Sequence, residues 1–272
     1  MLDRKQKYLQ IAFNRTLEEI AVMINSLPIS NRIIIEAGYP LVKTYGTQAI
    51  GAIKTFWVQR IFGYISEIPE ISQTNFFRIE GINSPLIELF LQSIRKEKLK
   101  KQKSEAAENK EITFAPYIIA DLKCMDRAFT EVEAAVSAGA SAVTCLGLAP
   151  VETINQFIKR CEEIKIDSIL DMMNIEYPFE VLSKLIKPPQ IVMLHRGVDE
   201  KENKEKEIPY HEIEKIKSVY DDVLIAVAGG ETVREVITGA FNGADILIVW
   251  RLFNENPEKV AELTNEFLEE IK

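Results

Sequence analysis

The chain repeats one kind of unit eight times, a short apolar run followed by a longer amphipathic stretch. The runs occupy residues 9–13, 32–36, 116–122, 142–146, 168–172, 190–194, 223–228 and 245–249. Because the runs lack regular polar alternation, they predict strands buried on both faces, as in a parallel sheet. The stretches 130–138, 151–165 and 232–241 predict intervening helices. For the first of these, Thr130 and Glu133 resemble a capping box, and Gly139 is expected to end the helix.

The spacing of these units favours a closed barrel. The run ends Leu122, Leu146, Met172 and Leu194 are separated by the length that one strand, one helix and two short loops need. Eight such units within 272 residues predict an α/β fold, a single (β/α)8 TIM barrel over residues 1–272. An open, doubly wound sheet is the alternative. The sequence has no GxGxxG motif near its start, which argues against the dinucleotide-binding version of that sheet.

One interval is much longer than the others and predicts an insertion of about residues 56–112 between strands 2 and 3. It contains an apolar stretch, 62–91, which suits a cover for one end of the barrel or a contact with another subunit. A lysine-rich run, 95–111, follows and predicts a solvated helix or loop, because like charges repel one another.

Composition limits the class of protein. The net charge of −8 and the pI near 5.1 argue against nucleic acid as a partner. Three scattered cysteines suit neither a disulfide framework nor a zinc site. The sequence has no apolar run of the length expected for a signal peptide or a membrane span. These features predict a soluble, cytoplasmic protein without a membrane partner.

Polar residues gather where the predicted strands end. In a TIM barrel these carboxyl ends line the active site. The residues are Asn14, Glu36, Asp121, Lys123, Asp126, Asp171, His195, Arg196, Gly229, Gly230 and Arg251. Core packing alone gives no reason to place charges at so many strand ends, so we expect catalytic or binding roles for them.

The densest group is Asp121–Lys123–Asp126. Asp121 and Lys123 lie two residues apart and therefore project to the same side of an extended chain. A lysine between carboxylates stays protonated, and such a lysine can deliver a proton to a carbanion or stabilise an enediolate. A plain salt bridge in a loop is the alternative interpretation.

Glu36 and Asp121 end adjacent predicted strands. Two converging carboxylates suit Mg²⁺, which binds a few carboxylates together with waters and substrate oxygens. A simple ion pair between Glu36 and Lys123 explains the same pattern equally well.

Gly229 and Gly230 follow a predicted strand and precede a helix, an arrangement that suits a phosphate site. Arg251, after the next strand, would add charge to that site, whereas a tight turn is the alternative role for the glycines. His195 stands at a strand end with Arg196 beside it, while His211 is expected at the surface.

Taken together, these pieces resemble the orotidine monophosphate decarboxylase superfamily. The strand ends IIADLKCMD, AGASAVTCLG, ILDMMN, VMLHRGVDE, IAVAGGET and ILIVWR, with LQIAFN and IIIEAGYPLVKTYG before them, are most similar to 3-hexulose-6-phosphate synthase and 3-keto-gulonate-6-phosphate decarboxylase. The resemblance covers about residues 9–55 and 113–270. The DxKxxD motif, in this order among its neighbours, carries most of the specificity.

The resemblance implies an aldehyde-lyase that joins ribulose 5-phosphate and formaldehyde through a Mg²⁺-stabilised enediolate, in a homodimer with shared active sites. Glu36 and Asp121 would face the metal, Lys123 the reacting carbon, and His195 would move protons. Asp126 would reach into the partner's site. The phosphate would bind at Gly229, Gly230 and Arg251, and we expect Asn14, Asp171 and Arg196 to bind substrate as well.

Two positions depart from the family pattern. Asn14 stands where the family has an aspartate, and Trp250 stands where a glycine usually precedes the arginine. The long insertion is a further departure. They leave two alternatives open, a decarboxylase of a phosphorylated keto acid or nucleotide, and a divergent, non-catalytic barrel that binds sugar phosphates.

Overall fold

The computed structural model, described here for residues 2–66, 114–203, 207–229 and 232–271, is a closed barrel of eight parallel strands. Each strand pairs with the next, and β1 pairs with β8, so the barrel closes in sequence order. The strands are β1 (Tyr8–Phe13), β2 (Ile33–Ala37), β3 (Ile118–Cys124), β4 (Ala142–Leu146), β5 (Asp167–Asp171), β6 (Ile191–His195), β7 (Leu224–Ala228) and β8 (Ile246–Val249). The predicted TIM barrel is confirmed, and the open-sheet alternative is wrong.

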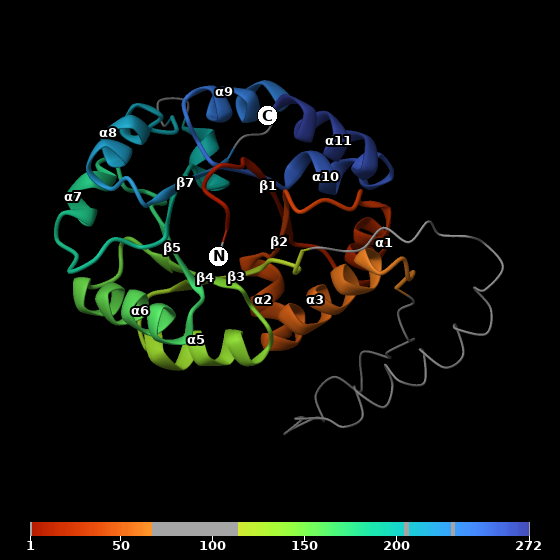
Figure 1. The fold of residues 1–272 in the computed structure, drawn as a ribbon, viewed down its shortest axis with the longest axis horizontal. Coiled ribbons are helices and arrows are strands. Elements are labelled where there is room, and N and C mark those ends of the chain that lie inside the picture. Colours follow the sequence, from red (N-terminus) through yellow and green to blue (C-terminus); the bar gives the residue numbers. More distant parts are fainter. Residues whose placement is uncertain (1, 67–113, 204–206, 230–231, 272) are drawn as a thin grey trace.

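A ring of helices surrounds the strands (Figure 1). The helices are α1 (Leu17–Ser26), α2 (Tyr39–Tyr45), α3 (Thr47–Ile61), α5 (Ala128–Ser137), α6 (Val151–Ile164), α7 (Pro178–Leu182), α8 (His211–Val219), α9 (Val233–Phe241), α10 (Arg251–Glu255) and α11 (Val260–Glu270). Short 3₁₀ turns lie at Asp199–Glu202 and Pro257–Lys259. None of the helices in the described ranges has the length and apolar character required to cross a bilayer.

Two apolar cores follow from the alternation of side chains along each strand. Outward-facing residues pack against the helices and form the larger core, which includes Phe13, Trp57 and Phe157. Inward-facing residues such as Ile119 and Ile169 fill the barrel itself. The strands are thus buried on both faces, which explains why they appear in the sequence as nearly continuous apolar runs.

The inward-facing row becomes polar toward the carboxyl ends of the strands. Continuing the alternation of the interior core, the polar residues in this row are Gln10, Glu36, Asp121, Thr144, Asp171 and His195. All but His195 are buried. The fold therefore concentrates hydrogen-bonding and ionisable groups at one end of the barrel interior, where active sites of TIM barrels lie.

Local details correct part of the sequence analysis. Helix α5 begins at Ala128, after Arg127 in a left-handed conformation with φ 53°, and its cap has no side-chain hydrogen bond. The predicted capping box of Thr130 and Glu133 is therefore wrong, because Thr130 already lies within the first turn. Gly139, with φ +97°, ends this helix as expected.

The long interval between β2 and β3 is present, with α2 and α3 at its start. The beginning of the predicted insertion, residues 56–61, belongs to α3. Most of the apolar stretch and all of the lysine-rich run lie outside the described residues.

Candidate active site

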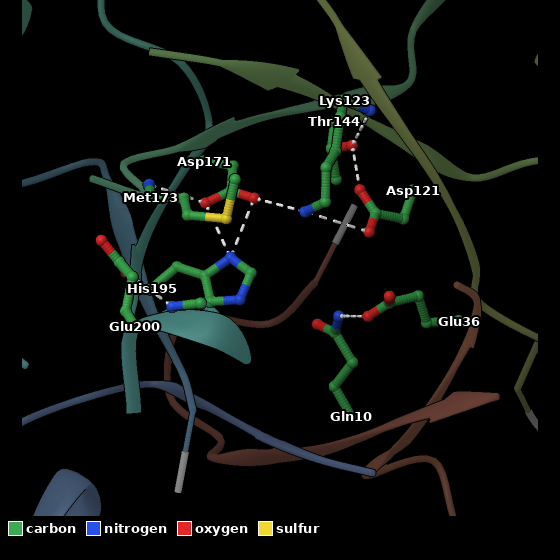
Figure 2. A network of polar contacts seen from close by, with 10 residues as sticks. Gln10, Glu36, Asp121, Lys123, Thr144, Asp171, Met173, His195 and Glu200 are labelled. Atoms are coloured by element: carbon green, nitrogen blue, oxygen red, sulfur yellow. Dashed lines mark hydrogen bonds and ion pairs between the residues drawn. The ribbon is translucent and has the colours of Figure 1, made fainter. Parts of the chain in front are cut away.

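Asp171, at the end of β5, is the centre of a buried polar network (Figure 2). Its side chain is fully buried and accepts hydrogen bonds from Lys123 Nζ at 2.8 Å, His195 Nδ1 at 2.9 Å and the Met173 backbone N–H at 3.0 Å. Burial alone would raise the pKa of Asp171, but His195 and Lys123 outweigh it and lower that pKa to about 2. Asp171 is therefore a carboxylate at neutral pH.

The ionised Asp171 determines which nitrogen of His195 carries a proton. A carboxylate only accepts hydrogen bonds, so His195 Nδ1 must donate. In the neutral imidazole, Nε2 is then the atom without a proton. Figure 2 shows the far edge of the ring facing the interior space between Asp171, Asp121 and Gln10. His195 is thus arranged to take up a proton at Nε2 from a molecule in that space.

Lys123 lies between two carboxylates. Its Nζ is 2.8 Å from Asp171 Oδ2 and 3.3 Å from Asp121 Oδ2. Burial alone would lower the pKa of Lys123, but the negative charges of Asp121 and Asp171 reverse this and raise it above its ordinary value. The site therefore contains a fixed ammonium group whose second carboxylate partner is Asp171 and not the Asp126 of the predicted cluster.

The backbone at Lys123 is unusual. Its φ of +46° lies in the left-handed region, where a side chain with a Cβ is strained. The pairing of β3 with β4 is irregular at this point, between Ala120 and Cys124. Thr144 stabilises the irregular segment, because its Oγ1 accepts from the Lys123 N–H at 3.0 Å and donates to Asp121 Oδ1 at 2.7 Å. The strain is thus located at the residue that presents the ammonium group.

Glu36 is the second inward-facing carboxylate. Burial, followed by the charge of Asp121, raises the pKa of Glu36 to about 7. Its Oε2 accepts a hydrogen bond from Gln10 Nε2, whereas Lys123 forms its ion pairs with Asp121 and Asp171. The simple Glu36–Lys123 ion pair is therefore not the arrangement in this structure. Glu36 and Asp121 instead form a pair of buried carboxylates on adjacent strands.

The predicted phosphate residues lie beyond β7 and β8. Gly229 has φ +105°, and a Cβ there would lie 2.6 Å from the Arg196 carbonyl oxygen, so glycine is required on both counts. Arg196 Nη2 donates to the Gly229 carbonyl oxygen at 3.1 Å and lies 3.3 Å from Glu235 Oε1. Arg196 therefore holds the loop after β7. Gly230 falls outside the described residues.

Arg251 is the first residue of α10, and its side chain lies along the indole of Trp250, 5.4 Å from the ring centroid. Its Nε is 3.9 Å from Glu255 Oε1. Trp250 packs against the interior core of the barrel. The large side chain at this position therefore faces inward at the end of β8.

Asn14 and Asp126 have different surroundings. Asn14 packs closely on Gly38, where a Cβ would collide with its Oδ1. That oxygen is buried and accepts no hydrogen bond from the described part of the chain. Asp126 is exposed beyond the end of β3. The structure thus assembles Glu36, Asp121, Lys123, Asp171 and His195 within one chain and leaves Asp126 at the surface.

Two residues of this network, Gln10 and Thr144, were not among the sequence candidates. Both lie inside predicted strands rather than at their ends, in the inward-facing phase of β1 and β4. The indication available in the sequence was the polar residue itself. A glutamine within a strand buried on both faces requires a polar partner inside the barrel.

The chain is similar to proteins of known family. A family model described as orotidine 5'-phosphate decarboxylase / HUMPS family matches residues 85–265. The bifunctional enzymes Fae/Hps of Methanothrix thermoacetophila and Methanocella arvoryzae are each 31% identical to this chain, over 266 and 268 residues respectively. Each alignment covers 97% of this chain but 53% of the relative, so the chain spans about half the length of the curated relatives it matches.

Solved structures agree on the fold. The 3-hexulose-6-phosphate synthase from Salmonella typhimurium superposes with a TM-score of 0.65 at 22% identity, covering 97% of this chain and all of that one. KGPDC from Streptococcus mutans superposes with a TM-score of 0.60 at 15% identity, covering 98% and 99%. The family match extends over more than half of the sequence, and the chain therefore belongs to the orotidine 5'-phosphate decarboxylase / HUMPS family.

Proposed function

We propose that the chain is an aldehyde-lyase of the 3-hexulose-6-phosphate synthase type, which joins ribulose 5-phosphate and formaldehyde to give 3-hexulose 6-phosphate. One observation carries the proposal. Asp171 fixes a proton-accepting nitrogen of His195 and the ammonium group of Lys123 around the same interior space, beside the carboxylates of Glu36 and Asp121. The named synthases among the relatives and the structural neighbours support this choice.

The positions of His195, Asp171 and Lys123 suit the formation of a carbanion and its addition to a carbonyl carbon. His195 Nε2 removes a proton from C1 of ribulose 5-phosphate, and Asp171 stabilises the imidazolium that forms. The electron pair from the broken C–H bond moves onto the C2 oxygen and gives an enediolate, which the Lys123 ammonium stabilises. C1 then attacks the formaldehyde carbon. The new C–C bond forms as the C2 carbonyl is restored and the π bond of formaldehyde breaks, and the former formaldehyde oxygen takes up the proton held by His195 Nε2.

We also propose Mg²⁺ as the cofactor, held by Glu36 and Asp121. Within the described ranges no three histidine, cysteine, aspartate or glutamate side chains are grouped closely enough to hold a metal. Two buried carboxylates nevertheless suit Mg²⁺, which retains waters and substrate oxygens in its remaining positions. Burial first, and the charge of Asp121 second, raise the pKa of Glu36, and a divalent cation would relieve the repulsion between the two carboxylates. When bound, Mg²⁺ would polarise the two sugar oxygens next to the reacting bond.

For the phosphate we propose the loop after β7 and the start of α10. Gly229 permits the left-handed turn that begins this loop, and Arg251 supplies a partly exposed guanidinium. The three cysteines of the chain are buried and free, which suits the reducing cytoplasm.

We propose further that two copies of the chain share active sites. Large apolar side chains are exposed after β3 and β4. Met125 lies in the loop after β3 and is 43% exposed, Phe129 lies in the first turn of α5 and is 60% exposed, and Leu148 follows β4 and is 49% exposed. Asp126 is exposed within the same segment. An apolar surface beside a carboxylate near the barrel mouth suits a second copy, whose site Asp126 would enter.

Complementation tests this shared site. Asp126→Ala and Asp171→Asn are each expected to be inactive alone. An equimolar mixture of the two variants should regain about a quarter of wild-type activity, since about half of the dimers are mixed and each mixed dimer has one intact site of two. Sedimentation at micromolar concentration supplies the assembly state. A monomer, or a mixture without activity, would contradict the proposal.

Formaldehyde-dependent consumption of ribulose 5-phosphate, measured with Mg²⁺, tests the activity itself. The control is Asp121→Ala, which removes one carboxylate of the pair and one partner of Lys123. Turnover no faster than this control would remove the synthase proposal. Release of CO₂ from a phosphorylated keto acid would indicate a decarboxylase instead. Binding of sugar phosphate without turnover would indicate a non-catalytic binding barrel. The observation that favours this alternative is the inward-facing side chain of Trp250.

A further inference from the structure

Gln10 is a fully buried polar residue in the middle of β1. It faces the barrel interior between Tyr8 and Ala12, two members of the inner apolar core. An amide at such a position costs free energy unless its polar atoms are hydrogen-bonded. Because Gln10 lies within an apolar layer, its amide needs hydrogen-bond partners inside the barrel.

One half of the amide has that partner. Gln10 Nε2 donates to Glu36 Oε2. Since Nε2 faces Glu36 Oε2, the carbonyl oxygen of the same amide faces a different direction. Gln10 thus holds the carboxylate of Glu36 in one orientation.

The other half has none. Gln10 Oε1 is buried and has no hydrogen-bond partner among the described residues. An unpaired buried acceptor typically costs about 1–3 kcal/mol. The nearby ammonium of Lys123 is committed to Asp121 and Asp171. Among the described residues, Oε1 is therefore a buried acceptor without a donor.

The direction of Gln10 indicates what that is. In Figure 2 its amide extends from β1 into the space bounded by Glu36, Asp121, Lys123 and His195, with Nε2 toward Glu36. Two of these neighbours are carboxylates, and a carbonyl oxygen beside two carboxylates forms an oxygen-rich cluster of the kind that hard divalent cations bind.

We propose that Gln10 belongs to the cation site, where it orients Glu36 through Nε2 and supplies Oε1 as a third oxygen, beside Glu36 and Asp121, to a divalent cation. The inference rests on the proposed function, to which it adds the identity of a further protein ligand. It explains both halves of the amide at once, the donated hydrogen bond and the unpaired acceptor.

Binding of Mn²⁺ to the full chain, followed by the electron paramagnetic resonance of the free ion, tests the proposal without using activity. Gln10→Met keeps the length of the side chain but removes both polar atoms, and it is expected to weaken Mn²⁺ binding by about 10- to 100-fold. Gln10→Glu retains an oxygen at the same position and is expected to bind Mn²⁺ at least as tightly as the wild type.

The matched control is Gln190→Met. Gln190 is also a barrel glutamine with hydrogen bonds, since its Oε1 accepts from the Ser168 N–H at 3.0 Å and from Ser168 Oγ at 2.6 Å, but it precedes β6 at the opposite end of the barrel. This variant is expected to bind Mn²⁺ as the wild type does. Should Gln10→Met not fold, Gln10→Asn keeps the amide but withdraws it by one carbon, and it should weaken Mn²⁺ binding in the same direction.

Unchanged Mn²⁺ affinity in Gln10→Met, or equal losses in Gln10→Met and Gln10→Glu, would overturn the role of Oε1. Wild-type protein that consumes ribulose 5-phosphate with formaldehyde in the presence of a chelator, and binds no Mn²⁺, would overturn the inference while the proposed reaction stands. Wild-type protein that binds Mn²⁺ through Gln10 without turnover would support the inference and remove the reaction.

Discussion

Asp171→Asn is expected to lower kcat for the proposed reaction by about 10⁴-fold, the loss associated with forcing a catalytic histidine into the wrong tautomer. The substitution keeps the shape of the side chain. The asparagine NH₂ group, however, would donate to His195 Nδ1, which would then have to accept, and the proton would move to Nε2. The atom that we assign as the base would already be protonated. The same change weakens the hold on Lys123, which now bonds to Asp171 Oδ2.

Nitrogen NMR of the histidine side chains separates this explanation from general disruption. The chain has two histidines, and His211, at 76% side-chain exposure, serves as the internal reference. In Asp171→Asn the His195 signals are expected to change tautomer while those of His211 stay unchanged.

The control for this substitution lies on the same strand. Asp167 is 4% exposed and accepts from the Tyr117 hydroxyl at 2.6 Å, at the other end of β5. Asp167→Asn should affect stability but leave the His195 signals in place. If Asp171→Asn retained kcat within about tenfold of the wild type, the tautomer mechanism would be wrong.

The sequence predicted the part of this site that depends on strand ends. Parallel strands in a barrel bring all their carboxyl ends to one rim, so residues far apart in the sequence, such as Glu36, Asp171 and His195, had to converge once the eightfold repeat was recognised. The DxKxxD spacing predicted Lys123 between Asp121 and Asp126, but the second carboxylate beside Lys123 is Asp171.

The other features of the fold and the site could not be predicted from the pattern of apolar runs. The side chain of Gln10 reaches up from within β1, and the left-handed turn at Lys123 arises from an irregular pairing of two strands. Likewise, the start of α5 is set by Arg127 in a left-handed conformation rather than by the capping sequence at Thr130. In each case tertiary packing overrides the local preference of the residue.

Lys123→Met is expected to destabilise the fold by about 3–5 kcal/mol at neutral pH, because it leaves buried carboxylates without their cation. Lys123 and its two partners are almost inaccessible, with side-chain exposures of 14% for Lys123, 11% for Asp121 and 0% for Asp171. Water therefore compensates poorly for the lost ammonium. Urea unfolding of the variant and the wild type at neutral pH measures the difference.

The pH dependence of that difference provides the sharper test. Burial alone would raise the folded-state pKa of Asp171, but His195 and Lys123 outweigh burial and lower that pKa from 3.8 to about 2. Such a group contributes stability above its unfolded pKa and loses that contribution as the pH falls through the folded value. Removing Lys123 should raise the pKa of Asp171. The difference in free energy of unfolding between the wild type and Lys123→Met is therefore expected to be largest at neutral pH and to narrow between about pH 4 and pH 2.

An exposed lysine with a carboxylate partner sets the scale for this effect. Lys187 lies 2.7 Å from Glu162 Oε1, with side-chain exposures of 60% and 51%, and solvent screens the pair. Lys187→Met should change the free energy of unfolding by no more than about 1 kcal/mol. A loss of that small size in Lys123→Met, or a gap that stays constant from neutral pH down to acid, would show that the buried carboxylates do not depend on Lys123. The assignment of Lys123 as the fixed cation of the site would then fail. If Asp121 and Asp171 stay buried and ionised without the ammonium group, that group is not what stabilises negative charge at this site.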